Sequence, residues 1–210
     1  MNLSNFDAYH FALSMVALVI CITIHEFSHA YSAYRAGDDT PRAQGRISLN
    51  PLDHLDPMGT IMMVVSSISG FGIGWGKPVQ INPANFRHPR WDNLRTSLWG
   101  PLSNLITAAV VGTALRLFSG SMPANVVFFL FLLTAISIGL AVFNLIPIAP
   151  LDGSHILSSL LPYEQARSYD LFMARYGFMI FIGLIFLAPD VLPAIIGPPR
   201  RLLMHLFVGI

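Results

Sequence analysis

Charged residues are scarce in this sequence: Asp, Glu, Lys and Arg make up 11% of its 210 residues, whereas 54% are hydrophobic. Soluble domains carry roughly 25% charged residues. So few charges cannot cover a water-facing surface, and the composition therefore predicts an integral membrane protein. No basic run is long enough to bind nucleic acid, and a formal net charge of +1 gives no other sign of such a partner.

Cysteine is almost absent, and the first 34 positions contain no Lys or Arg. The single Cys21 excludes an internal disulfide and gives no indication of redox compartment. Without Lys or Arg before Arg35, the first apolar segment lacks the basic region of a secretory signal peptide. We therefore expect that segment to be a retained membrane span.

Long apolar segments are the main feature of the sequence. Asp7 can cap a helix that runs from Phe11 to about Ala36, and Gly37 can end it. Residues 94–118 and 125–146 predict two further spans, and apolar segments interrupted by prolines follow after residue 176.

The segment 58–73 is apolar but only about 16 residues long, so it predicts either a short span or a re-entrant segment. The loops on either side, 35–56 and 77–95, are both rich in arginine. Basic loops are typical of the cytoplasmic side, and both loops can lie there only if 58–73 enters the membrane and returns. The charge pattern therefore favours the re-entrant alternative.

Two stretches suggest extended backbone. Residues 46–49 alternate polar and apolar side chains, as a short strand would, and the glycines at 70, 72, 74 and 76 allow another backbone to approach closely. The glycine segment is either a flexible loop or a segment that pairs with a substrate strand. The fold class expected is an all-α polytopic membrane protein with about five to six transmembrane or re-entrant segments and short β-strand or hairpin elements near the active site. We expect one domain over 1–210, with a catalytic core at about 8–160 and C-terminal membrane segments at about 165–210.

The strongest chemical motif is H-E-x-x-H, formed by His25, Glu26 and His29. Positions i and i+4 share a helix face, so the two imidazoles can bind one Zn²⁺, and the glutamate can act as general base towards a water at the metal. The motif is short enough to arise by chance. Its place inside an apolar segment indicates function, because ionisable groups in a membrane are costly.

A second motif lies in N-L-I-P-I-A-P-L-D-G, residues 144–153. Pro147 and Pro150 stop a regular helix at the end of an apolar segment and leave backbone groups exposed. Such irregular backbone is tolerated in a membrane only where protein or a wet cavity surrounds it, so the motif indicates a site. Asp152 is another ionisable group there, although its flanking residues can also simply form a turn.

These motifs together resemble the site-2 proteases, the zinc intramembrane metalloproteases. The resemblance rests on H-E-F-S-H at 25–29 and on residues 144–153, with support from G-P-L-S-N at 100–104. The stretches 45–60 and 74–79 are similar to the small subgroup without a PDZ domain. The similarity covers roughly residues 15–160.

The resemblance implies roles at matching positions. His25 and His29 would ligate zinc with Asp152 as the third ligand, Glu26 would activate water, and Asn144 would bind the substrate backbone or an oxyanion. Asn104 would be a substrate-binding residue or form a helix–helix hydrogen bond. His54 is a further catalytic candidate that could equally cap its loop. The substrate-binding residues expected from the two extended stretches are Arg46, Ile47, Ser48, Gly72, Gly74 and Trp75.

The function expected is zinc-dependent cleavage of a transmembrane protein substrate within the lipid bilayer. A zinc transporter and an inactive membrane-protein binder are the alternatives, although the sequence has no His-rich loop and keeps Glu26. The expected location is a prokaryotic cell membrane, with the active site towards the cytoplasm. The oligomeric state is open.

Overall fold

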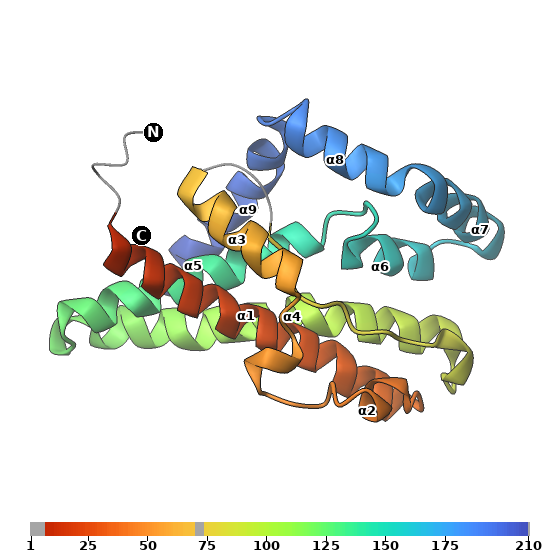
Figure 1. Ribbon diagram of the computed structural model, residues 1–210, viewed down its shortest axis with the longest axis horizontal. Coiled ribbons are helices and arrows are strands. Elements are labelled where there is room, and N and C mark those ends of the chain that lie inside the picture. Colours follow the sequence, from red (N-terminus) through yellow and green to blue (C-terminus); the bar gives the residue numbers. More distant parts are fainter. Residues whose placement is uncertain (1–6, 70–73, 210) are drawn as a thin grey trace.

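The computed structural model describes residues 7–69 and 74–209, which fold into a bundle of helices (Figure 1). The longer helices are α1 (Ala8–Ala36), α3 (Pro57–Ser69), α4 (Pro89–Phe118), α5 (Ala124–Asn144) and α9 (Val191–Val208). The shorter ones are α2 (Thr40–Ala43), α6 (Asp152–Leu160), α7 (Tyr163–Phe172) and α8 (Phe178–Phe186), and a π-helical turn, Met173–Gly177, joins the last two.

Helix α1 begins and ends as its sequence predicts. The Asp7 carboxylate accepts hydrogen bonds from the backbone N–H groups of Tyr9 and His10. Gly37 ends the helix in the left-handed region at φ 112° and returns its N–H to carbonyls of the last turn. Between these caps the helix has 29 residues, and its stretch from residue 11 to residue 24 is almost wholly apolar.

Five helical segments of the described residues are long and apolar enough to cross a membrane: 8–36, 89–121, 124–144, 163–186 and 191–208. The prediction of a multi-pass membrane protein is therefore confirmed. Helix α3 has 13 residues, a length of about 20 Å, which is too short to cross a hydrocarbon core of about 30 Å. Its length favours the re-entrant alternative for this segment.

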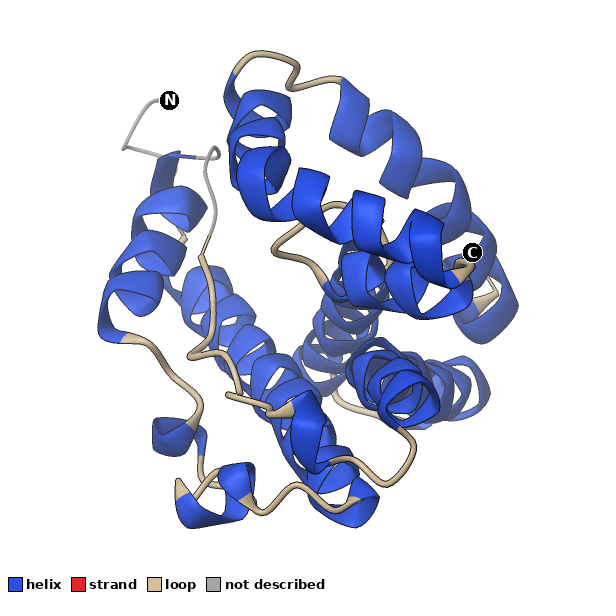
Figure 2. Ribbon diagram, turned by 90° about the vertical axis from the view of Figure 1, so that its right-hand side faces the viewer, coloured by secondary structure: helices blue, strands red, loops and turns tan. Residues whose placement is uncertain are grey.

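The predicted β-strand and hairpin elements are wrong for the residues that the structure describes, which contain no strand (Figure 2). Only an isolated antiparallel bridge joins Leu55 to Gly76. The buried Arg46 guanidinium donates to the carbonyls of Lys77 and Pro78, which an adjacent strand would otherwise use, and Pro78 has no N–H to offer. A side chain therefore replaces the expected backbone ladder.

Helix α4 packs against α1, α5, α6 and α9. Ala108 on α4 packs in a buried cluster with Ile138 of α5 and Met204 of α9. Close approach needs small residues here: a Cβ on Gly112 would lie 2.9 Å from Phe207 and 3.0 Å from Thr134. Because α4 contacts four other helices, it can position groups from several elements.

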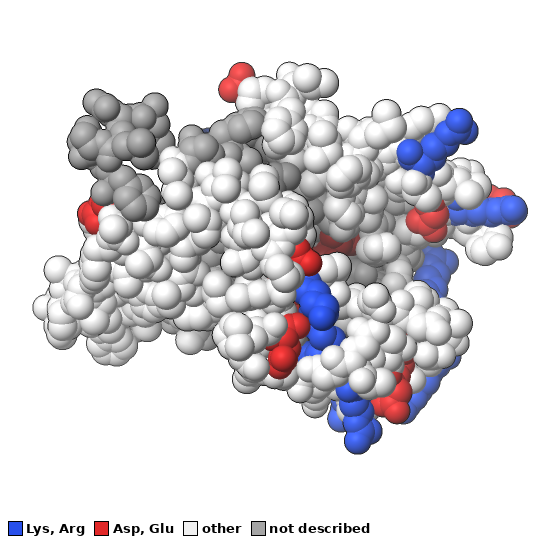
Figure 3. Space-filling model, viewed as in Figure 1, with Lys and Arg blue, Asp and Glu red and all other residues white. Residues whose placement is uncertain are grey.

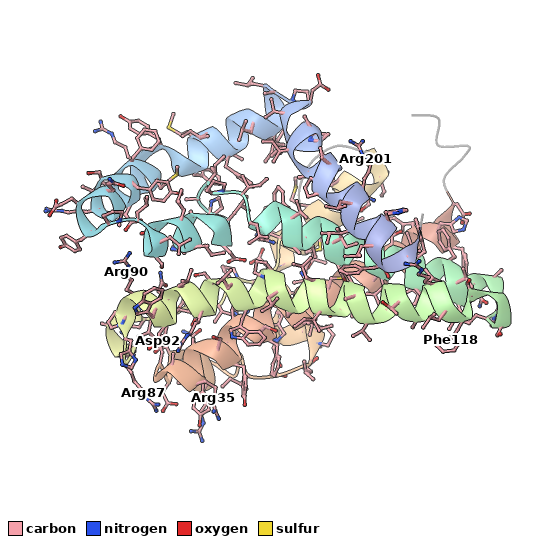
Figure 4. All side chains as sticks on the ribbon, turned by 180° about the vertical axis from the view of Figure 1, so that it is seen from behind. Arg35, Arg87, Arg90, Asp92, Phe118 and Arg201 are labelled. Atoms are coloured by element: carbon pink, nitrogen blue, oxygen red, sulfur yellow. The ribbon has the colours of Figure 1, made fainter. Side chains whose placement is uncertain are left out.

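Charged side chains gather at one end of the molecule, where α1 ends and α4 begins (Figure 3). Arg35, Arg87 and Arg90 lie at this end, and Phe118 lies at the opposite end (Figure 4). Asp38 ties the loops at the charged end together. Its buried carboxylate accepts hydrogen bonds from Thr40, from the Asn82 N–H at 2.7 Å and from the Asn85 side chain at 2.8 Å.

Candidate metal centre

The three predicted ligands meet at one point. His25 and His29 project from the same face of α1, and Asp152 is the first residue of α6. His25 Nε2 lies 3.1 Å from Asp152 Oδ2, and His29 Nε2 lies 3.2 Å from Asp152 Oδ1. The two Nε2 atoms are 3.1 Å apart. Residues 123 and 127 positions apart in the chain therefore form one compact group of donors.

The group fits Zn²⁺ in its spacing. Ligand atoms bonded to tetrahedral zinc at about 2.0–2.1 Å lie about 3.3 Å from one another, close to the 3.1 Å between the two Nε2 atoms. Each imidazole also has one carboxylate oxygen of Asp152 at a similar distance, 3.1 Å for His25 and 3.2 Å for His29. Two imidazoles and a carboxylate are also a donor set typical of catalytic zinc, which keeps a fourth position open for water.

Hydrogen bonding around the group also favours a bound cation. The carbonyl oxygen of Thr96 can only accept, so His29 Nδ1 carries a hydrogen and donates to it at 2.8 Å. In the neutral imidazole this leaves a lone pair on Nε2, which faces the carboxylate of Asp152. Asp152 Oδ2 is buried and has no hydrogen-bond partner within the described part of the chain. A cation between these lone pairs would satisfy them.

Helix α4 shapes the other side of the two imidazoles. A Cβ on Gly100 would lie 2.2 Å from His29 Nε2 and 2.7 Å from His25 Cε1, so only glycine permits this approach. One turn further along, the Asn104 side chain is fully buried, with Nδ2 at 3.3 Å from His25 Nδ1. Thr96, Gly100 and Asn104 are four residues apart and share one face of α4.

The loop before α6 and the far end of α6 place Asp152. A Cβ on Gly153 would lie 2.3 Å from the Ile146 carbonyl oxygen, so the chain can turn tightly here only with glycine. At the other end of α6, the Arg90 guanidinium of α4 donates to the carbonyls of Ser159, Leu160 and Leu161. These bonds satisfy carbonyls that the helix end would leave free.

Glu26 is held beside the histidines by the segment 74–79. Its Oε2 accepts a hydrogen bond from the Val79 N–H at 3.2 Å and lies 3.8 Å from an Arg46 guanidinium nitrogen. Gly76 allows this segment to lie against α1, because a Cβ there would be 2.6 Å from Ile22. The carboxylate next to the metal group therefore has a defined orientation.

His54 is connected to Glu26 through Arg46 and not through the metal group. Its ring is fully buried; Nε2 donates to the Ser48 carbonyl at 2.7 Å, and Nδ1 lies 3.4 Å from Arg46 Nη2. Both ring nitrogens are therefore occupied. This geometry places His54 where it can organise the loops near Glu26, while its catalytic role stays a prediction.

The remaining predicted residues have different surroundings. Asn144 is the last residue of α5, and its Nδ2 donates to the Leu140 carbonyl of the same helix. Gly74 lies against Met63 of α3, and Trp75 lies against Gly59. Ile47 and Ser48 belong to the irregular segment after Gly45, and Gly72 lies outside the described residues. Their roles in substrate binding stay predictions.

Sequence reasoning missed the parts of the site that act without a reactive side chain. Thr96 contributes a backbone carbonyl, Val79 contributes a backbone N–H, and Gly100 contributes space. The only signal available was the motif at 100–104, which marks the right helix without indicating what it contacts.

Comparisons with known proteins agree with this geometry. The family model described as Peptidase family M50 matches residues 119–188. The chain is 37% identical over 182 residues to "Putative zinc metalloprotease YwhC" of Bacillus subtilis, covering 83% of this chain and 80% of the relative. It is 32% identical to proteins named "Putative zinc metalloprotease Rip2" in Mycolicibacterium smegmatis and in Mycobacterium tuberculosis. Those matches cover 83% and 85% of this chain and 67% and 68% of the relatives.

No solved structure is significantly similar to the chain. The similarity to YwhC extends over most of both proteins, and the His25, His29 and Asp152 group is a donor set that suits catalytic zinc. This multi-pass membrane protein belongs to peptidase family M50, the site-2 protease family of metalloproteases.

Proposed function

We propose that this protein is a zinc-dependent endopeptidase that hydrolyses a peptide bond within or near a transmembrane segment of a membrane protein substrate. The observation that carries the proposal is the placement of the metal group. His25, His29 and the neighbouring Glu26 lie inside a helix that is long and apolar enough to span a membrane. A soluble substrate could not easily reach such a site.

The depth of the site follows from the helix geometry. Phe27, between the two histidines, is nine residues before the end of α1 at Ala36, a distance of about 14 Å along the helix. The other end, at Ala8, is about 28 Å away. The site is thus nearer to the end where Arg35, Arg87 and Arg90 lie. Basic residues favour the cytoplasmic side, so we propose an active site that opens towards the cytoplasm of a prokaryotic cell.

Each residue of the site has a defined chemical task in this proposal. His25, His29 and Asp152 would hold zinc, which when bound acidifies water and polarises a carbonyl group. Glu26 accepts the proton of the attacking water and later donates it to the leaving amine. The Val79 N–H and the Arg46 guanidinium hold the Glu26 carboxylate during both transfers.

The substrate proposed is a transmembrane helix that unwinds locally, because a helix hides its carbonyl groups in its own hydrogen bonds. An unwound segment needs backbone partners. The segment 74–79 runs beside Glu26, and an isolated antiparallel bridge pairs its Gly76 with Leu55, which supports a role in backbone pairing. Gly74, Trp75 and residues 46–48 are our candidates for substrate contacts, and Asn144 is our candidate for binding the substrate carbonyl.

Replacing Glu26 with glutamine tests this proposal. The amide has nearly the same shape but cannot take up the proton, so cleavage of a model transmembrane substrate in vesicles should fall at least about 100-fold. Zinc content, measured on the same preparation, should stay equal to that of the wild type, since Glu26 is not a ligand. Glu164, the only other glutamate in the chain, lies exposed on α7, and Glu164→Gln is the matched control.

The two measurements separate the possible functions. Unchanged cleavage by Glu26→Gln would show that the proposed proton transfer is wrong. Wild-type protein that carries zinc but cleaves no transmembrane substrate, and that moves zinc across the vesicle membrane in both forms, would instead identify a transporter.

A further inference from the structure

One of the two polar atoms in the Asn104 side chain has no evident role. Its side chain is fully buried between α4 and α1, and its Nδ2 lies 3.3 Å from His25 Nδ1. Its Oδ1 is buried and has no hydrogen-bond partner among the described residues. An unpaired buried carbonyl oxygen is costly, so this amide needs an explanation beyond helix packing.

Whether one ring nitrogen of His25 carries a hydrogen determines whether the other does. A neutral imidazole carries one hydrogen, on either Nδ1 or Nε2. With the hydrogen on Nε2, the lone pair is on Nδ1, which accepts from Asn104 Nδ2. To bind a metal, Nε2 must present its lone pair, so the hydrogen must be on Nδ1. Nδ1 then needs an acceptor, which an NH₂ group cannot provide.

Rotation of the Asn104 amide supplies that acceptor. A half-turn about Cβ–Cγ exchanges Oδ1 and Nδ2 with almost no change in shape. It places Oδ1 where it accepts the hydrogen of His25 Nδ1, and it moves Nδ2 to the position that has no partner among the described residues. We propose that Asn104 is a positioning residue for the metal ligand His25: its amide pairs with either tautomer, and its oxygen holds the Nδ1–H form that turns Nε2 to the metal. This inference rests on the proposed zinc site and is independent of peptide cleavage.

The other histidine shows the same arrangement with a fixed partner. His29 Nδ1 donates to the Thr96 backbone carbonyl at 2.8 Å, which can only accept and so permits only the metal-binding tautomer. Thr96 and Asn104 lie one turn before and one turn after Gly100, and α4 thereby contacts the rear nitrogen of both ligands. Hydrogen bonds of this kind fix the ring orientation and strengthen metal binding by about 10–100-fold.

The test compares side chains of similar size at position 104 in the full-length protein in detergent micelles. Zinc dissociation constants are measured by competition with a chromophoric chelator at one pH. Asn104→Leu has no acceptor and should bind zinc about 10–100-fold more weakly than the wild type. Asn104→Asp is acceptor-only and should bind zinc at least as tightly as the wild type.

Thr107→Val is the matched control, because the Thr107 hydroxyl donates only to the Ser103 carbonyl of its own helix. Its zinc affinity should equal that of the wild type. A Leu variant that binds zinc normally, or an Asp variant that loses as much affinity as Leu, would overturn the proposal and leave Asn104 as a helix–helix contact. If Asn104→Leu fails to fold, zinc binding by Asn104→Asp that is weaker than in the wild type is enough to overturn the proposal.

Discussion

Replacing Gly100 with alanine tests whether α4 must lie this close to the metal group. The new Cβ would be 2.2 Å from His29 Nε2, 2.5 Å from His29 Cε1 and 2.7 Å from His25 Cε1. Ordinary contacts begin at 3.4 Å, so the His29 ring or the helix must move by about 1.2 Å. If the ring moves, the atom displaced is the nitrogen expected to bind the metal.

The expected loss follows from how little displacement such a site tolerates. Metal–ligand distances hold within about 0.2 Å, and a misplacement of about 1 Å costs about 100-fold in a catalytic site. We therefore expect Gly100→Ala to weaken zinc binding by at least about 100-fold and to abolish most cleavage. Alanine is a better helix former than glycine by about 1 kcal/mol, so the helix itself should not be weakened.

Zinc competition with a chelator and cleavage of a model transmembrane substrate are the two assays. Gly139→Ala on α5 is the control, because a Cβ there meets nothing within 4 Å, and it should leave both measurements unchanged. If Gly100→Ala binds zinc as tightly as Gly139→Ala, then α4 does not confine the imidazoles and this account of the site is wrong.

Two further predictions concern the loops at the charged end. Burial raises the pKa of Asp38, but the hydrogen bonds that it accepts outweigh this and hold its pKa below the usual range. Its contribution to stability is therefore complete above about pH 4 and is lost as the pH falls through the lower folded pKa. Asp38→Asn should abolish that part of the pH dependence of thermal unfolding, and an unchanged profile would contradict it. Arg46→Ala should destabilise the protein by about 2–4 kcal/mol and expose 74–79 to proteases, with partial recovery in Arg46→Lys.

Much of the helical fold can be predicted from local signals. Asp7 and Gly37 mark the ends of α1 because capping depends on neighbouring residues alone. The lengths of the apolar segments likewise predict the spans at α4 and α5, since a bilayer requires about 20 residues whatever the helix packs against.

The predicted strands failed because pairing depends on a distant partner. The alternating pattern at 46–49 is a local signal, but a ladder requires free backbone groups on another segment. Those groups, the carbonyls at 77 and 78, bind the Arg46 side chain instead. Nothing in the sequence near Arg46 indicates that its guanidinium is buried.

The candidate site likewise has a part that local sequence predicts and a part that depends on distant contacts. The H-E-x-x-H spacing puts His25 and His29 on one face through local geometry, whereas the pairing with Asp152 was expected only from family resemblance. The contacts from Thr96, Gly100 and Asn104 depend on how α4 approaches α1. A single sequence does not indicate how closely two helices that are distant in the chain approach each other.

Helix α4 provides no ligand, yet it positions all three. Its face at 96, 100 and 104 confines the two imidazoles from behind. Its first turn reaches α6, where Arg90 binds the last carbonyls and Asn93 Nδ2 donates to Ser159 Oγ at 3.1 Å. Because α6 is only nine residues long, fixing its far end restricts the direction in which Asp152 projects. The distance between carboxylate and imidazoles is therefore set through one rigid helix, and substitutions on α4 should alter metal affinity although none removes a ligand.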